Sequence, residues 1–176
     1  MNLGLNDQHI LVAGGLGGIG IKTVELLETN DRILNSWSKK LNEKEKLFNK
    51  VCRLFPEKFK FINKKVYLTL LLSNNINIKK LNKIFRNKNN HTDILSFPFH
   101  QKKKAKETYL GDIIISYNYM NKPKKLSKYL FKEKVVKIFI HGFLHLLDFD
   151  HIKKNDYIKM RNEEQKIFKS VQKFIN

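Results

Sequence analysis

The segment from about residue 133 to 147, EKVVKIFIHGFLHLL, constrains the fold more than any other part of the chain. When it is wound as a helix, apolar side chains cover most of its circumference, so the helix must be buried between other layers. Its apolar residues are Val135, Val136, Ile138, Phe139, Ile140, Phe143, Leu144, Leu146 and Leu147. Because no apolar run in the chain approaches the roughly 18 residues that a membrane span needs, we expect no membrane anchor.

Strand and helix patterns alternate around this central helix. Short apolar or alternating runs predict strands at 66–73, 93–99 and 111–116, and a further short strand at 32–37. Helices are predicted at about 42–55, where Pro56 stops the helix, at 78–85, and at 155–174, with Asp156 as the N-cap. A chain of 176 residues is about the size of one domain, and the alternation indicates an α/β or α+β layer structure.

The first 30 residues differ in composition from the rest of the chain. They hold six of the eight glycines, whereas 34 of the 35 Lys and Arg residues follow residue 30. The pattern predicts an apolar strand, a glycine turn and then a helix with Ile21, Val24, Leu26 and Leu27 on its apolar face. With Gly14, Gly18 and Gly20 in matching positions, the segment resembles the opening unit of short-chain dehydrogenases, whose glycines let the backbone approach a dinucleotide.

The remainder of a dinucleotide-binding domain does not follow this unit. A second strand ending in an acidic residue and a Tyr and Lys pair should come next, but the chain turns into Lys- and Asn-rich sequence. One strand and one helix cannot build a cofactor site. We therefore expect residues 1–30 to be an atypical, non-functional leader, residues 31–176 to be the functional domain, and no nicotinamide cofactor to bind.

Charge and cysteine content indicate the kind of partner and the compartment. The formal net charge of +19 favours a polyanionic partner such as nucleic acid, because basic surfaces displace counterions from phosphates. Genome composition is a competing explanation, since Lys outnumbers Arg 31 to 4 and there are 19 Asn residues. Cys52 is the only cysteine, so it cannot form an internal disulfide, and we expect a small core residue. The chain also lacks the N-terminal pattern of a secretory signal, so we expect a cytoplasmic protein.

Three histidines follow one another closely at the end of the central helix. His141 and His145 are four residues apart and project from one helix face, near enough to share one ion. A turn after Leu147 would bring His151 to the same ion. Three imidazoles would leave a fourth position of zinc open for water, which is typical of a catalytic site, although nickel and copper also accept such ligands. The alternative is that the histidines only satisfy hydrogen bonds in the core and the loop.

The residue after the first histidine bears on the type of reaction. Zinc proteases with a similar motif have a glutamate there as the general base, and this chain has Gly142. We therefore expect no peptidase activity, and we expect the glycine to leave room beside the metal for a bulky substrate group. Phosphodiester cleavage fits better, because a metal and an arginine can stabilise charge on phosphorus and RNA supplies its own 2′-hydroxyl nucleophile.

The histidine segment HGFLHLLDFDH closely resembles the HGxLHLxGYDH motif of the YbeY family of bacterial endoribonucleases. The segments LNKIFRNKNNHTDILSFPF at 81–99 and YLGDIIIS at 109–116 are similar to two further motifs of this family, in the same order. The resemblance covers about residues 31–176. It implies an α/β (α+β) fold with a small mixed four-stranded sheet flanked by helices and a buried central helix that carries two zinc ligands.

The resemblance also implies an activity and a site. One Zn²⁺ ion would be bound by His141, His145 and His151, and the functional arginine of the family maps to Arg86. The implied activity is cleavage of single-stranded RNA, connected with maturation of the 3′ end of small-subunit ribosomal RNA and with ribosome quality control. Arg86 suits this activity because its planar guanidinium can donate two hydrogen bonds to one phosphate.

The chain departs from the family motif at two positions. The motif's glycine is Asp148 and its tyrosine is Phe149. A glycine at 148 would suit a left-handed residue at the end of the helix, and aspartate tolerates that conformation less well, so we expect a cost in stability. Asp150 is predicted either to orient a ligand histidine through its carboxylate or to serve only as a turn residue.

Two functions from different classes remain open on the sequence. The leading hypothesis is a zinc-dependent, single-strand-specific endoribonuclease that acts on ribosomal RNA and the ribosome. The alternative is a non-catalytic assembly factor that binds RNA or the ribosome and uses zinc only for stability.

Overall fold

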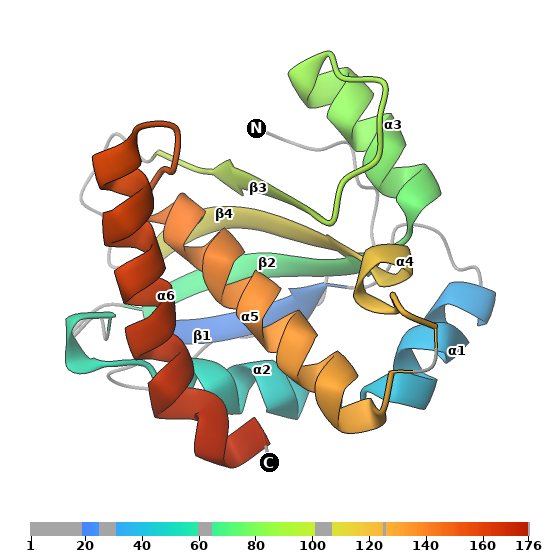
Figure 1. The fold of residues 1–176 in the computed structure, drawn as a ribbon, viewed down its shortest axis with the longest axis horizontal. Coiled ribbons are helices and arrows are strands. Elements are labelled where there is room, and N and C mark those ends of the chain that lie inside the picture. Colours follow the sequence, from blue (N-terminus) through green and yellow to red (C-terminus); the bar gives the residue numbers. More distant parts are fainter. Residues whose placement is uncertain (1–18, 25–30, 60–64, 101–106, 125, 176) are drawn as a thin grey trace.

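A computed structural model describes residues 19–24, 31–59, 65–100, 107–124 and 126–175 (Figure 1). The predicted strand before residue 14 lies outside these ranges. The elements in chain order are β1 (Ile19–Val24), α1 (Asp31–Lys40), α2 (Lys44–Arg53), a short 3₁₀ helix (Glu57–Phe59), β2 (Lys65–Ser73), α3 (Asn75–Arg86), β3 (Ile94–Pro98), β4 (Glu107–Ser116), α4 (Tyr117–Met120), α5 (Lys128–Leu146) and α6 (Lys154–Ile175). No helix in the described ranges is long and apolar enough to cross a membrane.

The strands form one mixed sheet in the order β1-β2-β4-β3. Strands β1 and β4 both run parallel to β2, whereas the edge strand β3 runs antiparallel to β4. The mixed α/β class is therefore confirmed, together with the predicted strands that correspond to β2, β3 and β4.

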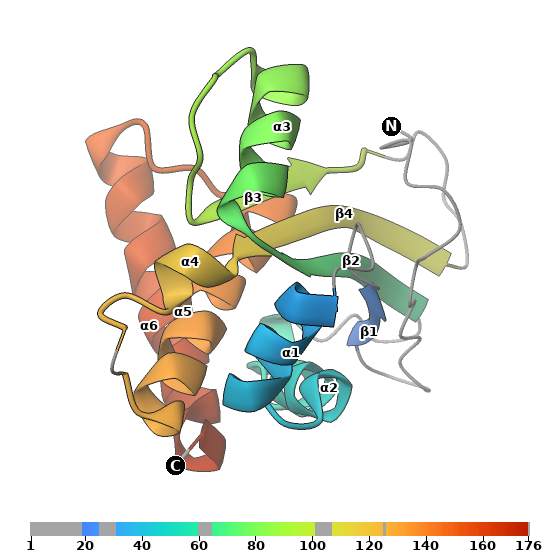
Figure 2. The same cartoon turned by 90° about the vertical axis from the view of Figure 1, so that its right-hand side faces the viewer.

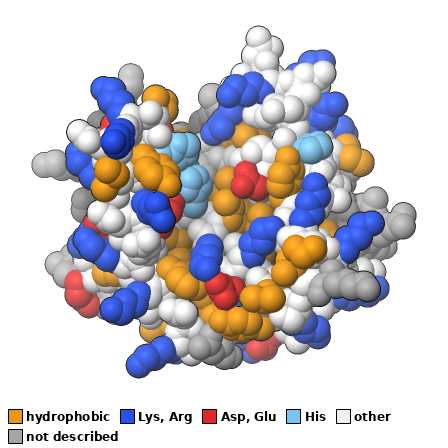
Figure 3. Space-filling view, viewed as in Figure 1, with side chains coloured by type: hydrophobic (Ala, Val, Ile, Leu, Met, Phe, Trp, Pro, Cys, Tyr) orange, Lys and Arg blue, Asp and Glu red, His pale blue; other side chains and the backbone are white. Residues whose placement is uncertain are grey.

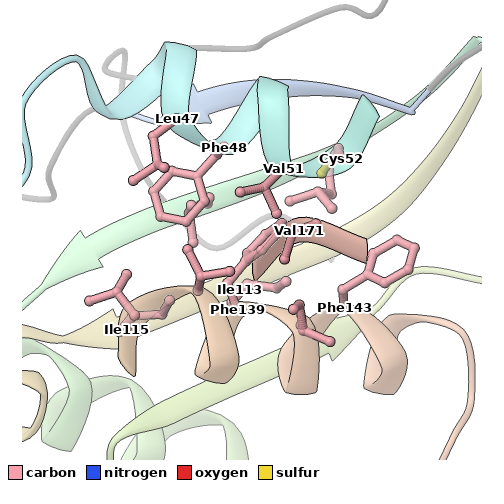
Figure 4. Close-up of a cluster of buried hydrophobic side chains, with 14 of the residues drawn as sticks. Leu47, Phe48, Val51, Cys52, Ile113, Ile115, Phe139, Phe143 and Val171 are labelled. Carbon is pink, nitrogen blue, oxygen red and sulfur yellow. The ribbon is translucent and has the colours of Figure 1, made fainter. Parts of the chain in front are cut away.

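Helix α5 crosses one face of the sheet and is buried, as its sequence predicts (Figure 1). It begins after Ser127, whose side chain accepts a hydrogen bond from the Leu130 N–H at 3.2 Å and so caps the helix. Its aromatic residues pack against α2, with the Phe139 ring centroid 5.0 Å from that of Phe48 (Figure 4). The predicted core role of Cys52 is confirmed, because it is buried beside Val51 in the same cluster.

Helix α3 lies on part of the opposite face of the sheet (Figure 2). Ile78 and Leu81 of α3 pack with Leu71, Leu95 and Ile114 of the sheet in a second, smaller core cluster. The sheet is thus a layer between helices, and this arrangement leaves the C-terminal end of α5 beside the edge strand β3.

The structure corrects three predictions near the chain start and at α6. The predicted strand at 32–37 belongs to α1, in which Trp37 is buried in the core and its carbonyl accepts a hydrogen bond at 2.7 Å from the N–H of Leu41, the buried residue that follows the helix. The Trp37 indole N–H also donates to the Ser73 carbonyl at 3.1 Å, which ties α1 to the end of β2. Helix α6 begins at Lys154, so Asp156 lies in its first turn instead of capping it.

The third correction concerns the predicted helix that included Ile21 and Val24. These residues lie in strand β1, which pairs with β2 from Ile19 opposite Val66 to Val24 opposite Leu71. Three of the six residues from 19 to 24 are Ile or Val, which favour strands, and the exposed edge of β2 offers unpaired backbone groups. The glycine spacing that resembles a dehydrogenase therefore leads into a strand, which contains Gly20, and not into a helix. Whether residues 1–30 contribute to function stays a prediction.

Candidate metal centre

The three histidines lie together where α5 ends and the chain turns toward α6. One ring nitrogen from each of His141, His145 and His151 lies within 4.8 Å of the corresponding atoms of the other two. The ring of His151 stacks on that of His141 with a centroid separation of 5.3 Å, and lies 5.0 Å from that of His145. The convergence expected from the spacing of these residues is therefore present.

The end of α5 explains how His151 returns to the helix. The Asp148 N–H donates to the His145 carbonyl and the Phe149 N–H donates to the Leu144 carbonyl, both at 3.1 Å. This pair of bonds is a Schellman motif, which requires a left-handed residue just after the helix. Asp148 takes that conformation, with φ of 62°, so the predicted left-handed position is confirmed.

The turn also fixes the hydrogen on the His145 ring. Its Nδ1 lies 2.9 Å from the Phe149 carbonyl oxygen, which can only accept, so Nδ1 carries the hydrogen and Nε2 has a free lone pair. Burial lowers the pKa of His145 and the neighbouring His141 lowers it further, while the bond to the Phe149 carbonyl acts in the opposite direction. The net effect favours the neutral imidazole, which is the form that binds a metal.

A carboxylate holds the other helical histidine. The Nδ1 atom of His141 lies 2.6 Å from Oε1 of Glu164 on α6. The Nε2 atoms of His141 and His145 then face each other at 3.1 Å. Two lone pairs at this separation repel unless a cation or a proton lies between them. Three imidazoles, of which His141 and His145 have fixed outer hydrogen bonds, are a donor set that suits zinc, so the residues fit the expected metal.

Glu164 is not among the residues that the sequence predicts for the site, although the sequence contains a signal for it. Residues Met160, Ile167 and Val171 are buried on α6 and follow the spacing of an apolar helix face. Position 164 lies on this same face, four residues after Met160 and three before Ile167. A carboxylate at a position where the pattern demands an apolar side chain needs a partner, and His141 is that partner.

Gly142 does not face the metal centre. A Cβ atom at this position would lie 2.6 Å from Cδ1 of Ile94, 3.0 Å from Oγ of Ser96 and 3.1 Å from Cγ2 of Ile113. The prediction that this glycine leaves room for substrate beside the metal is therefore wrong. The glycine instead lets α5 lie close against β3 and β4.

Arg86 and Asp150 are the two remaining candidates. Arg86 is exposed at the end of α3, where its Nη2 donates to the Ser96 carbonyl at 3.1 Å and its guanidinium lies 5.6 Å from the Phe97 ring centroid. The Asp150 carboxylate accepts a hydrogen bond from the His151 backbone N–H at 2.7 Å, which supports the turn interpretation. Figure 3 shows histidine side chains on the wall of a groove, with Lys and Arg side chains on both sides.

The chain matches the family model described as Endoribonuclease YbeY over residues 32–172. A protein of Pelagibacter ubique (strain HTCC1062) named Endoribonuclease YbeY is 61% identical over 136 residues, which cover 77% of this chain and 89% of the relative. Proteins of the same name from Fusobacterium nucleatum and Caldicellulosiruptor bescii are each 35% identical, over 60% and 59% of this chain and 67% and 72% of their own lengths.

Proposed function

Because the chain belongs to the family of YbeY endoribonucleases, and is thus a hydrolase that acts on RNA, we propose that it cuts single-stranded RNA at the three histidines. We propose ribosomal RNA as the substrate, with roles in maturation of the small-subunit 3′ end and in ribosome quality control. The observation that carries the choice of site is the convergence of His141, His145 and His151.

In this proposal the three histidines hold one zinc ion. Zinc would supply Lewis acidity, which lowers the pKa of water to about 7 and stabilises negative charge at phosphorus. The Phe149 carbonyl and the Glu164 carboxylate accept the Nδ1 hydrogens of His145 and His141, so that the Nε2 atoms stay turned toward the ion. The surrounding residues of α5 keep the histidine rings in place because the helix is buried along most of its length.

Arg86 is proposed to bind the phosphate of the RNA. A guanidinium has five N–H donors, and the Ser96 carbonyl takes one of them while the Phe97 ring supports one face of the group. This support fixes the guanidinium plane, so two of the remaining donors can meet two phosphate oxygens with little loss of side-chain entropy. The basic surface on both sides of the groove favours a polyanion for the same electrostatic reason.

The test is cleavage of a labelled single-stranded RNA by the protein alone, with a chelator, and with zinc restored. We expect cleavage to follow the metal, to be lost in His145→Ala, and to fall by about 10²- to 10³-fold in Arg86→Ala, as expected when one transition-state donor is removed. Arg86→Lys should recover little of this loss, because lysine cannot donate two parallel hydrogen bonds. Arg53→Ala on α2 removes an exposed arginine of equal charge and is the matched control.

Two outcomes would count against the proposal. Equal cleavage by the parent protein and by His145→Ala would place the activity elsewhere. Unchanged cleavage in Arg86→Ala would remove the arginine from the site while leaving the histidines in it. Binding of ribosomal RNA without any cleavage by the zinc-loaded protein would favour the non-catalytic assembly factor.

A further inference from the structure

We infer that Glu164 is a positioning residue, which fixes the tautomer and orientation of the His141 ring and thereby sets how tightly the three histidines bind a metal ion. The inference rests on the proposed metal site. It assigns a role to a residue of α6, an element that supplies none of the three ring nitrogens.

The contact between Glu164 and His141 is short and partly shielded from solvent. The two side chains are 31% and 26% exposed, and Oε1 lies 2.6 Å from Nδ1. Hydrogen bonds that involve an ionised group are shorter and about twice as strong as neutral ones. The position of the carboxylate is fixed by its own helix, since Met160 and Ile167 on the same face of α6 are buried in the core.

The contact decides which nitrogen of His141 can bind a metal. Neutral imidazole carries its hydrogen on either Nδ1 or Nε2, and a hydrogen on Nε2 would point at His145 and block the site. A carboxylate beside Nδ1 draws the hydrogen there and leaves the Nε2 lone pair facing the Nε2 of His145 at 3.1 Å. It also opposes rotation of the ring, because rotation would break the bond.

His145 uses a different acceptor for the same purpose. Its Nδ1 hydrogen is taken by the backbone carbonyl of Phe149, which no side-chain substitution removes. Glu164 is therefore the acceptor whose role can be tested by mutation. Histidine ligands whose outer hydrogen bond is removed typically bind metal 10- to 100-fold more weakly.

The neighbouring residue provides a matched control. Glu163 also lies on α6 and is more shielded, at 13% exposed, and its carboxylate pairs with Lys58 and with Lys166. The change Glu163→Gln alters the charge by the same amount and weakens the attachment of α6 to the 3₁₀ helix. Among the described residues, the ion pairs of Glu163 involve Lys58 and Lys166 and no histidine.

The first experiment compares the full chain with Glu164→Gln, Glu164→Ala and Glu163→Gln. Zinc and cobalt affinities are measured by competition with a chromogenic chelator, at a temperature where circular dichroism shows each protein to be folded. We expect Glu164→Ala to bind either ion 10- to 100-fold more weakly. Glu164→Gln should lie between, because its amide oxygen still accepts a hydrogen bond without the charge. Glu163→Gln should stay within about twofold of the parent protein, since no ligand contact changes.

The second experiment needs no metal. Imidazole ¹⁵N spectra of the metal-free protein report which ring nitrogens carry a hydrogen, and we expect a hydrogen on Nδ1 of His141 in the parent protein and a mixture in Glu164→Ala. A merely structural role of Glu164 would leave this tautomer unchanged. Should Glu164→Ala fail to fold, Glu164→Gln keeps the shape of the side chain and is measured in its place.

The outcomes separate this inference from the proposed function. Equal metal affinity in the parent protein and Glu164→Ala, or a His141 tautomer that does not change, overturns the positioning role. Failure of the parent protein to bind zinc at all refutes the proposed metal site instead, and the tautomer measurement still decides the role of Glu164.

Discussion

Replacement of Asp148 by glycine is expected to stabilise the protein. Asp148 has a φ of 62°, in the left-handed region where a Cβ atom crowds the following carbonyl. That conformation costs about 1–2 kcal/mol for a residue with a side chain, somewhat less for aspartate, and glycine returns roughly 0.5–1 kcal/mol of this as backbone entropy in the unfolded chain. The balance for Asp148→Gly is a gain of about 0.5–1 kcal/mol in the free energy of unfolding.

The charge of Asp148 contributes little to this balance. Its carboxylate lies 3.6 Å from Nε2 of His100, and both side chains are about 70% exposed, at 69% and 72%. Exposed pairs contribute at most about 1 kcal/mol and commonly nothing measurable. Backbone conformation should therefore decide the sign, and a gain of this size corresponds to a rise in melting temperature of roughly 1–4 °C for a chain of this length.

The assay is denaturant unfolding of Asp148→Gly, Asp148→Asn and Asp148→Ala beside the parent protein, all with the metal removed. All three variants lose the same charge, but they differ in their tolerance of a left-handed backbone, which decreases from glycine to asparagine to alanine. The expected order of stability is glycine, asparagine, aspartate and then alanine. A glycine variant less stable than the parent, or an alanine variant equal to the glycine variant, would refute the conformational argument.

Three further predictions concern α5, the edge strand β1 and the acid side of the pH range. Gly142→Ala should lower the unfolding free energy by about 1 kcal/mol. Overpacking against Ile94 costs roughly 1–3 kcal/mol, and the better helix propensity of alanine returns about 1 kcal/mol. A raised melting temperature would contradict the close approach of α5 to β3. Deletion of residues 1–30 should destabilise the protein and promote association, because it removes β1 and uncovers the edge of β2. Deletion of residues 1–18 spares β1 and is the control. Equal melting temperatures of the two truncated chains would contradict the stabilising role of β1. In the metal-free protein the pKa of His145 is lowered, so the unfolded chain binds a proton at this residue more readily than the folded chain. The free energy of unfolding should therefore decrease as the pH falls below about 6.5. The same decrease in His145→Asn would exclude this histidine as the cause.

The parts of the fold that the sequence predicts well are those with a strong local pattern. The sequence predicts five of these elements correctly, with ends that differ from the observed ones by a few residues: the buried helix α5, the strands β2, β3 and β4, and the amphipathic helix α6. Each has enough apolar residues at one spacing for burial to decide the conformation. The convergence of the three histidines followed from the same reasoning, because four residues on a helix and a short turn leave little freedom.

The errors came where local pattern and tertiary contact disagree. The apolar residues Ile33, Leu34 and Trp37 suggest a strand at 32–37, but the burial of Trp37 in the core and its hydrogen bond to the Ser73 carbonyl favour α1. The glycine-rich start suggested a helix after the turn, and the open edge of β2 instead selects a strand at 19–24. Neither outcome can be read from a short window, since both depend on partners more than 35 residues away.

The site contains the same division between local and tertiary information. The helix supplies His141 and His145, but the state of each ring is decided by groups outside it, namely the Glu164 carboxylate and the Phe149 carbonyl. Gly142 links the two levels, because the absence of a side chain lets α5 approach β3 closely enough for a single added Cβ to clash with Ile94. The carbonyl of Ser96, on the same strand as Ile94, accepts the hydrogen bond from Arg86. The packing of α5 on β3 therefore connects the histidines to the strand that holds Arg86, and under the roles proposed for these residues a side chain at position 142 should reduce RNA cleavage even where metal binding is unchanged.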